Sequence, residues 1–242
     1  MAKSTNSISS LRLFHFTQSM DYLQSWLTDG IPYTWQVERF PINSKKNVAF
    51  ATREICFCDI PMSRLKDHVE TYGHYGIGVN KLAAQDKGIS PVMYVSPKSP
   101  ILPGTKKDVE VLFKEYPELA CRIKQLSGYR YVEKGESEIK QSVYYYDEKE
   151  WRAIPGKNPI EVLPKTHHKD IVAKKNQNNQ DFPHQNFNDN LQFDIVKDIT
   201  YIIIEKQTDL PSMIDFLKDK FPNEYESILP KILVFDQLKY DL

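Results

Sequence analysis

Apolar residues recur at strand and helix spacings in short, alternating segments along the chain. The segment LRLFHFT predicts a strand at residues 11–17, and apolar residues spaced as on one helix face follow at 20–27 before Gly30. Residues 31–48, which contain Pro32, Pro41, Asn43 and two lysines, are predicted to be irregular. The apolar run at 49–59 predicts a buried strand that ends before a proline.

A second helix–strand unit follows this strand. Ser63 is predicted to cap a helix at 64–72, and the glycine-rich corner YGHYGIGV then leads into a strand that begins near Ile77. Five further strands and two longer helices are predicted downstream, among them a strand at 142–146 and the apolar run ITYIIIE at 199–205. The pattern is that of an α+β protein, because the strands and helices follow no regular βαβ rhythm.

The chain has a length suited to one domain, with a mixed, mainly antiparallel sheet flanked by helices. One segment departs from the rest in composition. Residues 165–190 are rich in Lys, Asn, Gln and His and contain few apolar residues, which predicts a polar mobile loop or insertion within the domain.

Charge and cysteine content restrict the function classes. The chain has 32 basic and 32 acidic residues, so no overall positive charge attracts nucleic acid. Three cysteines fit a reducing compartment, no apolar run is long enough to span a membrane, and the N-terminus lacks the apolar core of a signal peptide. We therefore expect a cytoplasmic protein with no membrane association.

The common catalytic motifs are absent. The sequence has no phosphate-binding loop, no dinucleotide fingerprint, no zinc-protease helix and no nucleophile elbow. Cys56 and Cys58 share one face of a strand, but a metal site would need further ligands, so buried core thiols are the simpler interpretation and no metal is predicted.

Three polar positions stand at the ends of predicted strands. His15 lies between two phenylalanines, so it faces away from both and is either a structural histidine or a site residue. The YGHYG corner is either a tight turn with packing tyrosines or a close approach to a ligand. Glu150 follows three tyrosines and precedes Arg152, and it is either a structural ion pair or a site carboxylate.

These segments together resemble the AbiGi-like abortive-infection family of bacterial phage-defence proteins. The resemblance runs through LFHFT, FCDIPMSRLKDHVETYGHYGIG, PVMYV, YYYDEKEWR and DITYIIIE, and covers the chain from about residue 13 to 217. It implies a bacterial antitoxin of a two-gene module whose cognate toxin, encoded nearby, is nucleotidyltransferase-like.

A second resemblance is to the ADP-ribosyltransferase fold, whose members carry a His, an aromatic residue and a late Glu in this order. It implies His15, Tyr75 and Glu150 as catalytic residues. It further implies NAD as a substrate held by His15, Thr17, Tyr72 or Tyr75, with Arg64 or Arg152 on the pyrophosphate.

Two functions follow from these resemblances. In the first, an ADP-ribosyltransferase-like enzyme uses NAD to modify a nucleic-acid or protein target during infection. In the second, a non-catalytic antitoxin neutralises its cognate toxin by direct binding, and the predicted loop at 165–190 is ordered by that partner.

Overall fold

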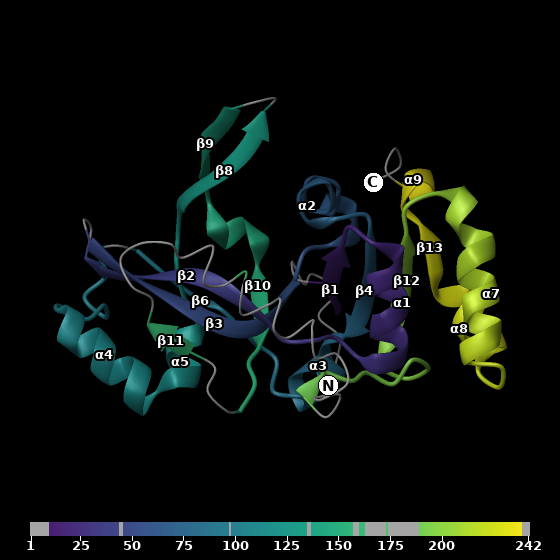
Figure 1. The fold of residues 1–242 in the computed structure, drawn as a ribbon, viewed down its shortest axis with the longest axis horizontal. Helices are drawn as coiled ribbons and strands as arrows, with labels where there is room; N and C mark the ends of the chain where they lie inside the picture. The colour runs from purple at the N-terminus through teal and green to yellow at the C-terminus, as the bar shows by residue number, and fades with distance from the viewer. Residues whose placement is uncertain are drawn as a thin grey trace, which may run out of the picture. The chain divides into compact units, whose positions relative to one another are not determined.

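The computed structural model describes residues 10–43, 46–96, 98–134, 137–156, 160–162, 173 and 189–238. The segment predicted to be a polar loop, residues 165–190, lies almost entirely outside the described residues. The described part confirms the α+β class and the mainly antiparallel sheet (Figure 1).

The backbone contacts divide the chain into two compact units. The first unit comprises Met1–Pro32, Cys56–Ile89 and Phe187–Leu242, and the second comprises Tyr33–Ile55 and Ser90–Asn186. The single domain expected from the sequence stays a prediction, and the two units are described in turn.

The first unit is built on five neighbouring strands. Their order is β13-β12-β4-β1-β3, where only the last residues of β3 belong to this unit. All neighbouring pairs are antiparallel except β12 and β13, which are parallel. The strands are β1 Arg12–Thr17, β3 Lys46–Cys58, β4 Tyr75–Asn80, β12 Ile199–Ile204 and β13 Ile232–Val234.

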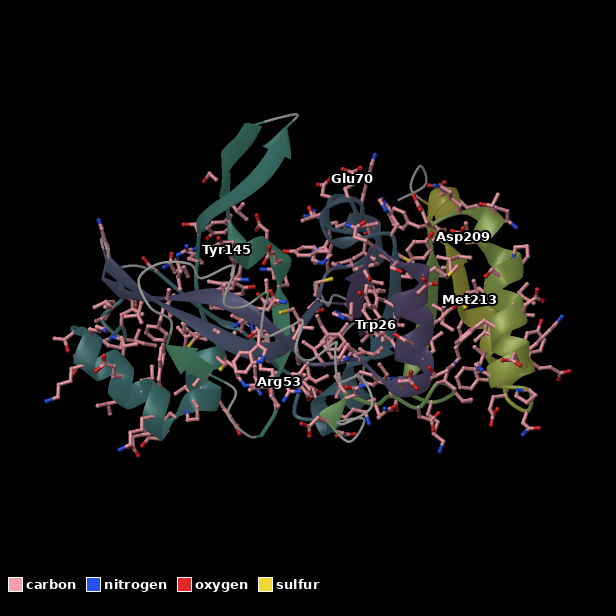
Figure 2. All side chains as sticks on the ribbon, in the orientation of Figure 1. Trp26, Arg53, Glu70, Tyr145, Asp209 and Met213 are labelled. Carbon is pink, nitrogen blue, oxygen red and sulfur yellow. The ribbon has the colours of Figure 1, made fainter. Side chains whose placement is uncertain are left out.

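Helices cover both faces of these strands. Phe14 and Phe16 of β1 point to one face, where they pack with Leu65, just before α2, and with Val69 within it. His15 points to the opposite face, where the ring of Trp26 in α1 lies 4.4 Å from its own. Figure 2 marks Trp26 on α1 and Met213 on α7, the helix that contacts α1. The helical segments of this unit are α1 Met20–Asp29, η1 Met62–Arg64, α2 Lys66–Tyr72, α3 Lys81–Asp86, η4 Gln207–Asp209, α7 Leu210–Lys220, α8 Tyr225–Ile228, η5 Leu229–Lys231 and α9 Phe235–Leu238.

The predicted end of α1 at Gly30 is confirmed, but the predicted start of α2 is wrong. The Ser19 side chain accepts a hydrogen bond from the Asp21 amide, and Gly30 closes the helix with a positive φ of 80°. Ser63, in contrast, lies within the short helix η1, and α2 begins only after Leu65, without a side-chain cap. The proline before η1 starts a tight turn that uses up the residues assigned to the first helical turn.

The second unit contains strands β2 and β3, β10 and β5, and two small sheets. The segment 31–48 predicted to be irregular forms β2 (Thr34–Asn43), which pairs with β3 along its whole length. The prediction was wrong because the tertiary pairing overrides the weak local preference of proline for loops. The remaining strands are β5 Ser90–Pro91, β6 Met93–Val95, β7 Ile123–Gln125, β8 Gly128–Lys134, β9 Ser137–Val143, β10 Glu150–Ala153 and β11 Ile160–Val162.

Aromatic packing builds the core of this unit. Phe40 of β2 and Phe50 of β3 both contact Phe113, with ring centroids 5.5 Å and 4.9 Å from it. Phe113 belongs to α4 (Lys106–Glu115), which begins at a capping box of Thr105 and is followed by α5 (Pro117–Cys121). The strand predicted at 142–146 ends early, because Tyr145–Glu148 forms a 3₁₀ turn, η2. No helix in the described residues is both long and apolar enough to cross a bilayer.

The turn after α2 generates a stability prediction. Gly73 has a φ of 124°, and a Cβ at this position would lie 2.1 Å from the carbonyl of Thr17. We expect Gly73→Ala to lower the free energy of unfolding by about 2–5 kcal/mol, from backbone strain and from the clash. Urea denaturation of the purified variant measures this loss.

Gly88→Ala is the matched control. Gly88 also has a positive φ, 76°, but a Cβ there meets no atom within 4 Å. Gly88→Ala should therefore lower the free energy of unfolding through backbone strain alone, by about 1–2 kcal/mol. Equal losses in the two variants would show that the close approach of Gly73 to β1 is not a constraint on the fold.

Candidate functional site

In the first unit, His15 is enclosed by aromatic rings on the face of β1 that α1 covers. Its ring lies 4.4 Å from Trp26 and 5.4 Å from Phe57, and its Nδ1 is 2.7 Å from the carbonyl oxygen of Cys56. Burial lowers the pKa of His15 to about 4, and the bond to that carbonyl opposes the shift only in part. The imidazole is therefore neutral at pH 7. Because a carbonyl only accepts, Nδ1 carries the proton and Nε2 is left as an acceptor.

The register of β1 and β4 places two other predicted site residues beside His15. Thr17 pairs directly with Tyr75, and His15 pairs with Ile77 two positions along. Residues that face each other across an antiparallel pair point to the same side of the sheet. His15, Thr17 and Tyr75 therefore share one face of this strand pair.

The hydroxyl of Tyr75 is occupied by acidic partners. It donates to a carboxylate oxygen of Asp209 at 3.1 Å and lies 3.5 Å from one of Glu205. Burial and the hydrogen bond to Asp209 raise the pKa of Tyr75 to about 12. Two carboxylates at this position favour a neutral or cationic neighbour over a phosphate.

The other two predicted cofactor residues belong to segments that pack on the Phe16 face. Tyr72, at the end of α2, stacks on His68 at 4.4 Å, and His68 in turn lies 5.8 Å from Phe16. Arg64 is exposed in η1, the turn that leads into α2. The predicted NAD-binding set is thus divided between the two faces of the sheet in this unit.

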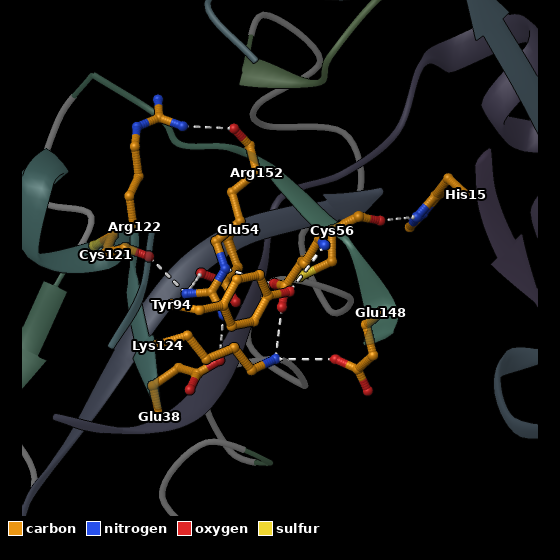
Figure 3. Close-up of polar contacts among 11 residues, drawn as sticks. His15, Glu38, Glu54, Cys56, Tyr94, Cys121, Arg122, Lys124, Glu148 and Arg152 are labelled. Atoms are coloured by element: carbon orange, nitrogen blue, oxygen red, sulfur yellow. Dashed lines mark hydrogen bonds and ion pairs between the residues drawn. The ribbon is translucent and has the colours of Figure 1, made fainter. Parts of the chain in front are cut away.

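Glu150 belongs to the second unit, where both of its carboxylate oxygens are held by cations. Oε1 lies 2.6 Å from Nε of Arg152, and Oε2 lies 2.5 Å from Nζ of Lys124 (Figure 3). The residue is 5% exposed. Of the two interpretations that the sequence left open for Glu150, the ion pair with Arg152 is confirmed.

Arg152 is the centre of this cluster. Its side chain is fully buried, and its guanidinium also contacts the carboxylates of Glu38 in β2 and Glu54 in β3 at 2.5 Å and 3.0 Å. It donates as well to the carbonyl of Cys121 at the end of α5, 2.6 Å away. We call Arg152, Lys124 and the four carboxylates around them the buried charge cluster; its acidic members are Glu38, Glu54, Glu148 and Glu150.

The cluster pushes the pKa values of its carboxyl groups in opposite directions. Burial raises the pKa of Glu54 to about 8, and the attraction of Arg152 offsets only part of this. Burial acts on Glu150 too, but Arg152 and Lys124 outweigh it and lower its pKa to about 2. Burial also opposes the charge of Lys124, yet Glu150 raises the pKa of Lys124 well above its usual value. At neutral pH Glu54 is therefore protonated and the pair of Glu150 with its two cations is ionised.

Glu150 and Arg152 are identifiable from the sequence, but most of their partners are not. Lys124, Glu38 and Tyr94, whose hydroxyl accepts from the Glu150 amide at 2.9 Å, come from three other strands. Glu54 offered one signal, because a glutamate inside an otherwise apolar strand is expected to have a buried partner. Glu148 lies in η2 and not in β10, and its carboxylate also reaches Lys124.

The comparisons with known proteins give the family. A family model described as "Putative abortive phage resistance protein AbiGi, antitoxin" matches residues 36–205, well over half of the chain. The chain belongs to the AbiGi family. The AbiGi match spans every member of the buried charge cluster and begins after His15 and Thr17.

One curated relative carries the same family name. The abortive phage resistance protein AbiGi of Lactococcus lactis subsp. cremoris is 27% identical to this chain, over 77% of this chain and 87% of that protein. No solved structure matches the chain. The likeness to ADP-ribosyltransferases therefore stays a prediction for this AbiGi protein.

The opposite pKa shifts predict a pH dependence that Glu54→Gln removes. Native Glu54 keeps its proton up to a pKa of about 8, whereas an unfolded glutamate ionises near 4.5, so the native state binds more protons between these values. The contribution of Glu54 to stability is then fully present at low pH and is lost as the pH rises. Between about pH 5 and about pH 9, wild type should lose more stability than Glu54→Gln, in urea titrations at each pH.

The other titrating groups do not mimic this effect. His15 contributes stability that is lost as pH falls below its unfolded pKa, which is the opposite sign, and it is present in both proteins. Glu226→Gln, on an exposed residue of α8, serves as the control substitution. Parallel pH profiles for wild type and Glu54→Gln would contradict a protonated Glu54.

Proposed function

We propose that this AbiGi protein is an antitoxin of an abortive-infection module and that it neutralises a cognate toxin by direct binding, without catalysis. The family description supports the antitoxin role. The observation that carries the non-catalytic mechanism is the burial of Glu150 between Arg152 and Lys124.

The contacts of Glu150 suit a structural role better than a catalytic one. A carboxylate that stabilises a developing cation on a substrate must present at least one oxygen to that substrate. Both oxygens of Glu150 instead neutralise cations that are themselves buried, with side chains 0% and 14% exposed. Releasing either oxygen would leave a buried cation without its partner, at a cost of several kcal/mol.

Direct binding makes a quantitative prediction about stoichiometry. An inhibitor that acts by occupancy neutralises its target only when about one equivalent is present, whereas an enzyme acts repeatedly. We expect the nucleotidyl-transfer activity of the toxin encoded by the neighbouring gene to fall linearly with added antitoxin. It should reach its floor at about one equivalent, with or without NAD.

The mass of the complex provides the control for that titration. Light scattering on the mixture should give the summed mass of the two proteins, and cells that express both genes should grow. Full neutralisation by a small fraction of one equivalent, dependent on NAD, would overturn direct binding. Absence of both a complex and neutralisation would overturn the antitoxin role itself.

NAD-dependent modification of a nucleic-acid or protein target is the second candidate function. One observation favours it: His15, Thr17 and Tyr75 share one face of the β1–β4 pair. The set as a whole does not fit NAD, however, because Tyr72 and Arg64 belong to segments on the opposite face and two carboxylates engage the Tyr75 hydroxyl. No reaction step is therefore assigned to it.

Calorimetry with NAD tests this second candidate separately. The second candidate function predicts that the wild-type protein binds NAD and that His15→Ala weakens this binding about tenfold or more. Tyr22→Ala, which changes an exposed residue of α1, is the control and should bind as wild type does. Melting curves confirm that both variants are folded. Absence of binding at millimolar NAD would reject NAD as a ligand of the His15 face.

A further inference from the structure

Exposed tyrosines in the second unit form a cluster next to the buried charge cluster. Tyr144 and Tyr146 are 48% and 43% exposed. Their ring centroids lie 6.0 Å apart, and Tyr94 contacts Tyr146 edge to face at 5.4 Å. We call these three tyrosines, with the following Asp147, the tyrosine platform.

The turn η2 fixes which tyrosines face solvent. Tyr145 is half-buried, and its ring lies so close to Gly128 that a Cβ there would lie 2.6 Å from it. Tyr144 and Tyr146, on either side of it, are left exposed. Lys149 closes the turn with a φ of 46°, the only positive φ of a non-glycine residue in the described part of the chain. A strained residue at an exposed turn requires that the surrounding structure hold it, and such residues cluster at functional sites.

Contacts with the buried charge cluster hold the tyrosine platform in place. The amide of Glu150 donates to the Tyr94 hydroxyl, and Lys124 bonds to both Glu148 and Glu150. Nζ of Lys124 also lies 4.9 Å from the ring of Tyr145. The exposed rings are therefore held on a rigid base before any partner arrives, which lowers the entropy lost on binding. Rigid, exposed tyrosines of this kind are typical anchors of protein interfaces.

The chemistry around the rings indicates a cationic partner group. Nζ of Lys149 lies 3.2 Å from the centroid of Tyr146, so the platform already binds one ammonium on an aromatic face. Tyr144 has no cation over its ring in the part of the chain that the structure describes, and Asp147 is exposed without an ion pair there. An arginine that stacks on Tyr144 and pairs with Asp147 would satisfy both.

The charges around the tyrosine platform disfavour a nucleic acid as its partner. Among Lys124 and residues 147–150, carboxylates outnumber ammonium groups three to two, and Lys124 is already neutralised by Glu148 and Glu150. Stacked bases would bring phosphates next to Asp147, where like charges repel.

We propose that the tyrosine platform is the surface on which this protein binds its toxin, and that it receives an arginine-bearing surface of that toxin. This inference rests on the proposed antitoxin function. In this proposal, η2 and β6 form the interaction surface. The buried charge cluster supports that surface.

Substitutions on the platform test this assignment through the affinity for the purified toxin. Tyr144→Ala and Asp147→Lys should each weaken binding about tenfold or more, and Asp147→Lys should also reverse the salt dependence of the affinity. Tyr116→Ala, which removes a 63% exposed tyrosine of the same unit, should stay within about twofold of wild type. All three positions are exposed, so unchanged melting temperatures are expected.

The outcomes separate this inference from the proposed function. Toxin binding by wild type that survives both platform substitutions overturns the platform and leaves the antitoxin role intact. Absence of toxin binding by wild type overturns both. A single-stranded oligonucleotide serves as the competing probe: oligonucleotide binding that Tyr144→Ala abolishes, with toxin affinity unchanged, would show a nucleic-acid surface instead.

Discussion

The buried guanidinium of Arg152 is the constraint on which the second unit depends. It joins β10 to β2 through Glu38, to β3 through Glu54 and to the end of α5 through the carbonyl of Cys121. A charge buried to this degree is tolerated only when every direction of the guanidinium finds an acceptor. β2, β3 and β10 must therefore keep one arrangement, because moving any of them would remove one of the acceptors of Arg152.

The buried charge cluster contains four carboxyl groups and only two cations, and its carboxyl groups remain buried in two different ways. One carboxyl group, that of Glu54, takes up a proton, and Glu150 remains ionised because two cations hold it. The same arrangement connects structure to the proposed function. Glu150 and Lys124 are engaged with each other and with Arg152 or Glu148, so the exposed groups beside them are tyrosines and Asp147, the groups on which the proposed protein contact rests.

The first unit presents the opposite case, a histidine whose charge is suppressed. His15 lies between aromatic rings, donates to a backbone carbonyl and is neutral, so its ring packs as part of the sheet face. Its alignment with Thr17 and Tyr75 follows from strand register alone. The alignment is therefore set by the β1–β4 pairing, and ligand binding at this face stays a prediction.

The sequence by itself determined the class of fold, the family and most local elements of this protein. The alternation in LRLFHFT placed Phe14 and Phe16 in the core and His15 opposite, and Gly30 set the end of α1, because these features depend on neighbouring residues. Tertiary structure decided what depends on distant ones. Residues 34–43 became a strand through pairing with β3, and Glu150 became part of a buried cluster through Lys124, 26 residues away in the chain. Local sequence encodes periodicity and caps, but a buried charge is defined by partners that only the folded chain brings together.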